Sequence, residues 1–276
     1  MADALAAPSA PLARPRALSW RALRFWCFRW SRTWRSTLAG NVVYPLVYLA
    51  AIGIGLGHLV NHHLAADHGA GTIGGVSYLA FVTPGILAAS MMQIAVHEAT
   101  YPVMGAIRWD YAYLGQLASP LRIGDIVFGH LGFIGVRALF ASSFFLAVAA
   151  AFGALSSPEA IVGVPIAIVV ALAFGAPVAA FAVTRDNDSA FSSIQRLGVV
   201  PLFLFSGCFF PIGELPEVLR VLAVCTPLYQ GVVLERACSL GTLGAPENLA
   251  HGAYLLVMAT GGFLVARRTY QHRLAR

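Results

Sequence analysis

IVFGHLGFIGVRALFASSFFLAVAAAF, residues 126–152, is an apolar run that carries one charged side chain, Arg137. A helix needs about 20 apolar residues to cross the hydrocarbon core of a bilayer, and this stretch exceeds that length. Comparable runs occupy residues 38–60, 78–96, 161–183 and 249–266, and a shorter one occupies residues 197–210. The sequence therefore predicts an all-α integral membrane protein with six transmembrane helices.

The composition agrees with a membrane protein. Apolar residues make up 58% of the chain, charged residues only 11%, and the mean hydropathy is +0.74, whereas soluble domains carry about 25% charged residues. With 276 residues the chain can supply a membrane domain but no sizeable soluble one. The basic residues lie at the ends of spans and form no continuous stripe, which favours membrane topology and anionic lipid over nucleic acid.

The positions of the arginines predict the orientation. All 18 basic residues are arginine; seven lie in the first 35 residues and four in the last ten. Six spans put four more in inner loops and two in outer segments, and Lys/Arg-rich flanks stay in the cytoplasm. We therefore expect a multi-pass membrane protein with both termini cytoplasmic. The first long apolar run is too long for a cleavable signal peptide.

The chain divides into four segments. Residues 1–17 are rich in Ala and Pro and are expected to be a disordered tail. Residues 18–37 predict a cytoplasmic interfacial helix, because Trp26, Trp30 and Trp34 share one side and most arginines face the other. A merely charged flank of the first span is the alternative. Residues 38–268 form the six-span domain, and residues 269–276 a cytoplasmic tail.

The segment after the short apolar run predicts an outer re-entrant structure. Residues 212–237 are too charged to span lipid and too apolar for an ordinary loop. We expect two short helices that dip back from the outer face beside a substrate exit, with Phe209 and Phe210 packed inward against a second copy. The residues of this exit segment are Pro211, Glu214, Pro216, Glu217 and Pro227.

Arg137 is the main candidate for intramembrane chemistry. A charge within a span costs several kcal/mol, so it should face the interior or a wet cavity and be paired. It could contact an anionic headgroup or a polar network between helices, and a structural pairing with a carboxylate or backbone carbonyls is the other interpretation. His97 and Glu98 could relay protons, although such a pair more often marks the water boundary.

Other chemistries find little support. The His- and Asp-containing stretch 61–68 is more typical of a solvated loop than of a metal site. Asp125 and His130 have the wrong helical spacing for a catalytic dyad, and the four cysteines lack CxxC spacing. A phosphate-binding GxxxxGK[ST] loop needs a lysine, and the chain has none. If transport is driven by ATP, ATP and Mg²⁺ must bind to a partner ATPase, and we expect no cofactor on this chain.

A series of short motifs resembles the type-2 ABC export permeases. The motifs are WRALR (20–24), GNVVYPLVY (40–48), GVSYLAFVTPG (75–85), IGDIVFG (123–129), PLFLFSGCFFP (201–211), LP (215–216) and TPL (226–228). They occur in the family's order from about residue 20 to 268. Within the family the chain is most similar to nodulation lipo-oligosaccharide exporter permeases and to their polysaccharide- and drug-export relatives.

The resemblance implies a permease that pairs with a second copy or a sister subunit and docks separate ATPase subunits. Its substrate would be an amphipathic molecule: a glycolipid, a polysaccharide or a lipophilic drug. We expect the substrate path to include Arg137, Phe205, Phe209 and Phe210. Leu114 and His130 stand where relatives usually carry glutamates. A membrane-embedded lipid- or glycan-modifying enzyme is the alternative function.

The loop of residues 108–122 is the expected ATPase contact. Aromatic residues and arginine are enriched at protein interfaces, and a loop anchored by aromatics in the headgroup region is an equally good interpretation. The expected contact residues are Arg108, Trp109, Asp110, Tyr111 and Tyr113.

Overall fold

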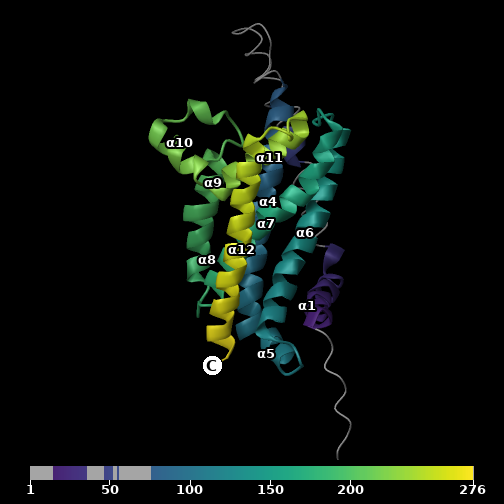
Figure 1. Cartoon of the computed structure of the whole chain (residues 1–276), viewed down its shortest axis with the longest axis vertical. Coiled ribbons are helices and arrows are strands. Elements are labelled where there is room, and N and C mark those ends of the chain that lie inside the picture. The colour runs from purple at the N-terminus through teal and green to yellow at the C-terminus, as the bar shows by residue number, and fades with distance from the viewer. Residues whose placement is uncertain (1–14, 36–46, 52–54, 56–75, 276) are drawn as a thin grey trace, which may run out of the picture.

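The computed structural model describes residues 15–35, 47–51, 55 and 76–275, and the elements in this part of the chain are all helical (Figure 1). In chain order they are α1 (Pro15–Trp30), α4 (Tyr78–Arg108), α5 (Ala112–Leu117), α6 (Ile123–Ala151), η2 (Pro158–Val162), α7 (Gly163–Ala182), α8 (Ser189–Ser193), the π-helical η3 (Ile194–Val199), α9 (Val200–Phe205), η4 (Ile212–Glu214), α10 (Glu217–Val224), α11 (Pro227–Leu240) and α12 (Glu247–Leu274).

Four described helices, α4, α6, α12 and α7 extended by η2, are long and apolar enough to cross a membrane; α10 and α11, taken as one bent span, would make five. The expected first span, residues 38–60, falls almost wholly outside the described residues, so the count of six remains a prediction. The described part is an all-helical membrane bundle, as the sequence predicts.

α4 is longer than its apolar run. The apolar run ends at Val96, but the helix continues to Arg108. At ~1.5 Å per residue its 31 residues extend ~46 Å, which exceeds the ~30 Å hydrocarbon core. α4 is therefore longer than a helix needs to cross the hydrocarbon core, and α5 follows shortly after its end.

α7 lies at the centre of the bundle and packs against α4, α6 and α12. Small residues allow the close approach, as is typical of helix pairs in membranes. At Gly262 of α12 an added Cβ would lie 2.7 Å from Cδ of Pro177 on α7. The tight contact explains why these two helices have runs of Gly and Ala where they meet.

α1 packs lengthwise on α6, parallel to the span (Figure 1). The Ser19 hydroxyl donates to Asp125 near the start of α6, and the ring of Trp30 lies 5.4 Å from that of Phe140. The helix ends at Trp30, earlier than the predicted residue 37, and Trp34 is exposed. The apolar side of α1 therefore covers a neighbouring helix.

The two ends of the bundle carry different elements. α5 and the C-terminal end of α12 lie at one end, and α10 and α11 lie at the other (Figure 1). The predicted topology places residues 97–125 and the C-terminus together, opposite residues 211–248, and the structure has this arrangement. Which end faces the cytoplasm remains a prediction from the arginine distribution.

The re-entrant segment consists of helices joined by sharp turns. The helical run that precedes it extends from Ser189 to Phe205, so the expected short span 197–210 starts earlier and ends sooner than predicted. Gly207 then adopts φ +80°, a conformation that costs glycine little. α10 and α11 meet at 79°, which is neither a straight membrane-crossing helix nor an extended loop.

Candidate functional site: a polar cluster inside the bundle

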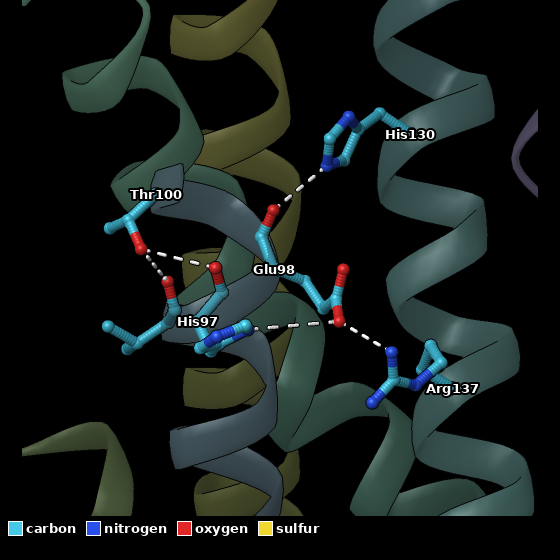
Figure 2. Close-up of polar contacts among 6 residues, drawn as sticks. His97, Glu98, Thr100, His130 and Arg137 are labelled. Carbon is cyan, nitrogen blue, oxygen red and sulfur yellow. Dashed lines mark hydrogen bonds and ion pairs between the residues drawn. The ribbon is translucent and has the colours of Figure 1, made fainter. Parts of the chain in front are cut away.

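Arg137 is paired with a carboxylate on a neighbouring helix. Its Nη1 lies 2.5 Å from Oε1 of Glu98, and both side chains are largely buried, with exposed fractions of 12% and 9% (Figure 2). Arg137 lies ~21 Å along α6 from Ile123, near mid-helix. The pair therefore places two opposite charges inside an apolar bundle, where removing one partner would leave the other as an unpaired buried charge.

Glu98 also joins α4 to α6 through its backbone. Nε2 of His130 lies 3.0 Å from the Glu98 carbonyl oxygen, and His130 and Arg137 lie about two turns apart on the same face of α6. Nδ1 of the more exposed His97 lies 3.9 Å from the Glu98 carboxylate. Figure 2 shows these contacts converging on Glu98 from both helices.

A chain of hydrogen bonds extends the cluster to α5 and α12. Nδ1 of His130 lies 2.6 Å from the hydroxyl of Tyr113, which lies 3.3 Å from the hydroxyl of Tyr270. A carbonyl oxygen can only accept, so Nε2 of His130 donates to Glu98; in the neutral ring Nδ1 then accepts from Tyr113. Tyr270 in turn donates to Tyr113, so one arrangement of protons satisfies the whole chain.

The side chain of Tyr113, on the inner side of α5, is fully buried. Burial, and next the neighbouring Tyr270, raise the pKa of the Tyr113 phenol well above its usual value, so the phenol remains a hydrogen-bond donor at physiological pH. Tyr113 therefore presents no surface to a partner protein. It was expected among the ATPase contacts, but its buried side chain instead supports the loop from beneath. His130 is the group that Tyr113 contacts from beneath the loop.

Two cavities flank the Glu98–Arg137 pair. One of about 740 Å³ lies between α1, α4 and α6, and one of about 490 Å³ lies between α4, α6 and the α8–η3 region. Both are lined by His97, Glu98, Tyr101 and Arg137. The second is also lined by residues of the π-helical η3, and such segments are frequent at functional sites.

The tryptophans of α1 form the aromatic wall of the larger cavity. The ring centroid of Trp26 lies 4.3 Å from that of His130, and the Arg137 guanidinium lies 5.8 Å from the ring of Trp30. An arginine over an aromatic face gains a cation–π attraction. α1 therefore belongs to the site as well as to the surface of the bundle.

The expected ATPase-contact loop has ion pairs on its flanks and aromatics at its tip. Arg108 pairs with Asp186, which also binds Nη2 of Arg273 at 2.5 Å. Asp110 pairs with Arg29 of α1. Trp109 and Tyr111 are exposed, and Tyr111 adopts φ +52°. These contacts tie the loop to α1, the α7–α8 connection and α12.

The aromatic residues expected in the substrate path lie in another region. Phe205 ends α9, and Phe209 packs edge-on against Phe203 at 5.0 Å within the same chain. Phe210 is half-buried. The structure brings none of these phenylalanines into the cavities beside Arg137, so the expected path residues form two separate groups.

The prolines of the exit segment begin or flank helices. Pro211 precedes η4, Pro216 precedes α10, and Pro227 is the first residue of α11, positions that proline tolerates because it lacks only an unused donor. Glu214 and Glu217 are exposed at this end.

The sequence interpretation missed the burial of three ionisable side chains, Glu98, Glu235 and Arg236. Glu98 was expected to mark the water boundary, but it is the partner of Arg137. The sequence signal that could have identified the pair is an acidic residue at the end of one apolar run and a basic residue within another. Arg236, counted among outer-segment arginines, is largely buried, and its Nη2 donates to the carbonyls of Gly207 and Phe81 at 3.0 and 3.3 Å. No sequence signal identifies Tyr270.

The remaining candidates are separated or lie outside the described residues. The Asp125 carboxylate accepts from Ser19 and from the Arg122 backbone amide, whereas His130 binds Tyr113, so they form no dyad. Residues 61–68 fall outside the described part of the chain. Within that part no group of three or more His, Cys, Asp or Glu could hold a metal.

Comparison with known proteins shows the family. The chain is similar to Nodulation protein J of Rhizobium leguminosarum bv. trifolii, with 33% identity over 77% of each chain. It is 30% identical to Nodulation protein J of Rhizobium leguminosarum bv. viciae, over 90% of this chain and 91% of the relative. Nodulation protein J of Rhizobium meliloti is 27% identical over 89% of each chain. The ABC-2 type transporter family matches residues 16–238, and the chain therefore belongs to this family of multi-pass membrane subunits of ABC exporters in bacterial cytoplasmic membranes.

Proposed function

We propose that the chain moves an amphipathic substrate outward by means of a separate ATPase. Candidate substrates are a glycolipid or lipo-oligosaccharide, a polysaccharide and a lipophilic drug. The observation that carries the proposal is the cavity of about 740 Å³ in which tryptophans face the Glu98–Arg137 pair. Such a lining can accommodate apolar and polar parts of one molecule, since ligand sites combine apolar walls with a few placed polar groups.

The ATPase would dock on the turn between α4 and α5, with Trp109 and Tyr111 as its contact residues. Both side chains are exposed in a part of the fold that ion pairs hold in place. Because Asp186 clamps both Arg108 and Arg273, a push on the loop would be transmitted to α12 as well as to α4. Binding of ATP and Mg²⁺ is assigned to the partner, and a second permease copy would complete the path.

The docking surface is tested by co-purification of the chain with a candidate ABC ATPase. Replacing Trp109 and Tyr111 with Ala should weaken the complex by a few kcal/mol, as expected when two interface anchors are lost, and should abolish substrate-stimulated ATP hydrolysis. The control is Leu249→Ala, since Leu249 is 77% exposed at the opposite end of the bundle. Unchanged co-purification of the double variant would contradict the docking surface.

The substrate path is tested separately in proteoliposomes that contain the complete transporter. Fluorescent analogues of a lipo-oligosaccharide, a polysaccharide and a lipophilic drug are compared for ATP-dependent transport. Replacing Tyr101 with Ala alters a residue that lines both cavities and should raise the half-saturating concentration of the transported class. An unchanged transport curve for every class would argue against these cavities as the path.

A further inference from the structure

An apolar groove follows the outside of α6 between α7 and α12. It has a volume of about 740 Å³, and its lining includes Leu131, Val136, Leu139, Ile168, Leu256 and Leu264. The hydroxyl of Thr260, the polar side chain in this lining, donates to the Leu256 carbonyl at 2.7 Å. The groove therefore offers an apolar occupant no unsatisfied polar group.

A basic pocket of about 720 Å³ continues the groove towards the end of the bundle that carries α5. Arg122 and Arg267 line it, together with Ser19 and Gln271. Phe128 and Phe263 line both spaces, so the two are contiguous. The composite site is apolar along its length and basic at one end.

The charges of the pocket are available to a ligand. Asp125 also lines it, but its carboxylate already accepts from Ser19 and from the Arg122 backbone amide. Among the described residues, the guanidinium groups of Arg122 and Arg267 form no ion pair. The two exposed guanidiniums outnumber the one carboxylate of the pocket, so the pocket attracts an anion.

The dimensions match one leaflet of a bilayer. Along α6 the groove extends from Phe128 to Leu139, a rise of ~16 Å, and half of a hydrocarbon core is ~15 Å. A molecule with its chains in the groove would therefore hold its headgroup beside the two arginines. Basic pockets between transmembrane helices are known to bind anionic headgroups.

We propose that this site binds an anionic bilayer phospholipid, with its acyl chains in the groove and its phosphate beside Arg122 and Arg267. A second copy of the chain could cover an apolar groove, but it would leave the two guanidiniums without an anion. The proposal is independent of the exported substrate, since neither Glu98 nor Arg137 lines the groove or the basic pocket.

The test is native mass spectrometry of the full chain, released from nanodiscs that contain phosphatidylglycerol or phosphatidylcholine. The wild type should retain phosphatidylglycerol in preference to phosphatidylcholine. R122Q/R267Q should lose affinity for phosphatidylglycerol on the order of tenfold, and Ala259→Phe, which fills the groove without changing charge, should also reduce retention. The matched control R24Q/R268Q removes two exposed arginines that do not line the site and should behave like the wild type.

Three outcomes would overturn the proposal. They are equal retention of the two lipids by the wild type, wild-type retention by R122Q/R267Q, and an equal loss in the control. Cross-linking of a cysteine at position 259 to the same position in another copy would identify a protein occupant instead. Melting temperatures of all variants are measured in parallel, and Arg267→Gln alone replaces R122Q/R267Q if the double variant does not fold.

Discussion

At the scale of single residues, Glu98 and Arg137 are the most consequential pair in the bundle. Burying either charge alone in an apolar environment costs free energy, and the ion pair offsets this cost for both residues. The same two residues line both cavities, so the pair separates two spaces that a substrate could occupy in succession. Rearrangement of one ion pair would change the lining of both cavities at once.

A double-mutant cycle measures the coupling within this pair. Arg137→Leu alone should lower stability by about 3–5 kcal/mol, because it leaves the Glu98 carboxylate buried without a partner. Glu98→Leu combined with Arg137→Leu should cost less than the sum of the single changes, and unfolding in detergent is the measurement. Arg220→Leu, at an exposed position of α10, is the control and should stay within about 0.5 kcal/mol of the wild type. Additive losses would show that the two side chains act independently.

The Asp186 clamp predicts a pH dependence. The hydrogen bond from Arg273, and then its charge, lower the pKa of the Asp186 carboxyl. A lowered pKa in the folded state means that the stabilisation is complete above the ordinary value of about 3.9 and is lost as the pH falls through the lowered pKa. The melting temperature of Asp186→Asn should therefore be below that of the wild type at pH 7, and the difference should vanish under acid conditions. Asp188→Asn, which removes a neighbouring exposed carboxylate, is the control. A melting-temperature difference that does not shrink as the pH falls would contradict the assignment.

At the scale of elements, the contact of α1 with α6 determines the shape of the larger cavity. A Cβ on Gly129 would lie 2.5 Å from Cβ of Ala22 and 2.7 Å from its backbone carbonyl carbon. Glycine at this position lets the helices approach until Trp26 reaches His130. α1 is thus an integral wall of the site, and a change at one glycine should displace it.

Gly129→Ala tests this contact against a matched change. In a helix, Gly→Ala normally stabilises by up to about 1 kcal/mol, so Gly252→Ala, where an added Cβ meets nothing within 4 Å, should be neutral or stabilising. Gly129→Ala should instead destabilise the chain and increase the exposure of Trp26, as detected by melting temperature and tryptophan fluorescence. Equal melting temperatures and equal tryptophan fluorescence of the two variants would show that α1 can move away from α6 without loss of stability.

At the scale of the whole molecule, the two ends of the bundle are chemically distinct. One end carries the α4–α5 turn, the Asp186 clamp and the basic pocket, and the other carries the bent α10–α11 pair. In the proposed function, the ATPase docks at the first end and the substrate leaves at the other. The arginine distribution predicts that the α5 end is cytoplasmic.

Cysteine labelling in intact cells tests this orientation. In a background without native cysteines, Gly213→Cys near the α10 end should react with an impermeant maleimide, and Gly115→Cys in α5 should remain unlabelled until the cells are lysed. Both positions have open space around an added Cβ, so reactivity reports the side of the membrane. Labelling of position 115 in intact cells would invert the topology.

The sequence by itself determined the class of this protein. Long apolar runs admit only spanning helices, because lipid offers the backbone no hydrogen-bond partner. The motifs from residue 20 to 228 identified the family, and the prolines after Phe210 predicted the bent helices α10 and α11. Helix ends were less accurate: α4 continues past its apolar run, since a helix can extend into water once it is capped and packed.

Only the tertiary structure decided which side chains meet. The partners Glu98 and Arg137, or Tyr113 and Tyr270, are far apart in the sequence, and their contact depends on the rotation and register of whole helices. These are determined by small-residue packing at sites such as Gly129 and Gly262, and packing depends on both helices at once. For the same reason Tyr113, an expected surface residue, is buried: a pattern within one segment shows which side is apolar, but not which neighbour will cover it.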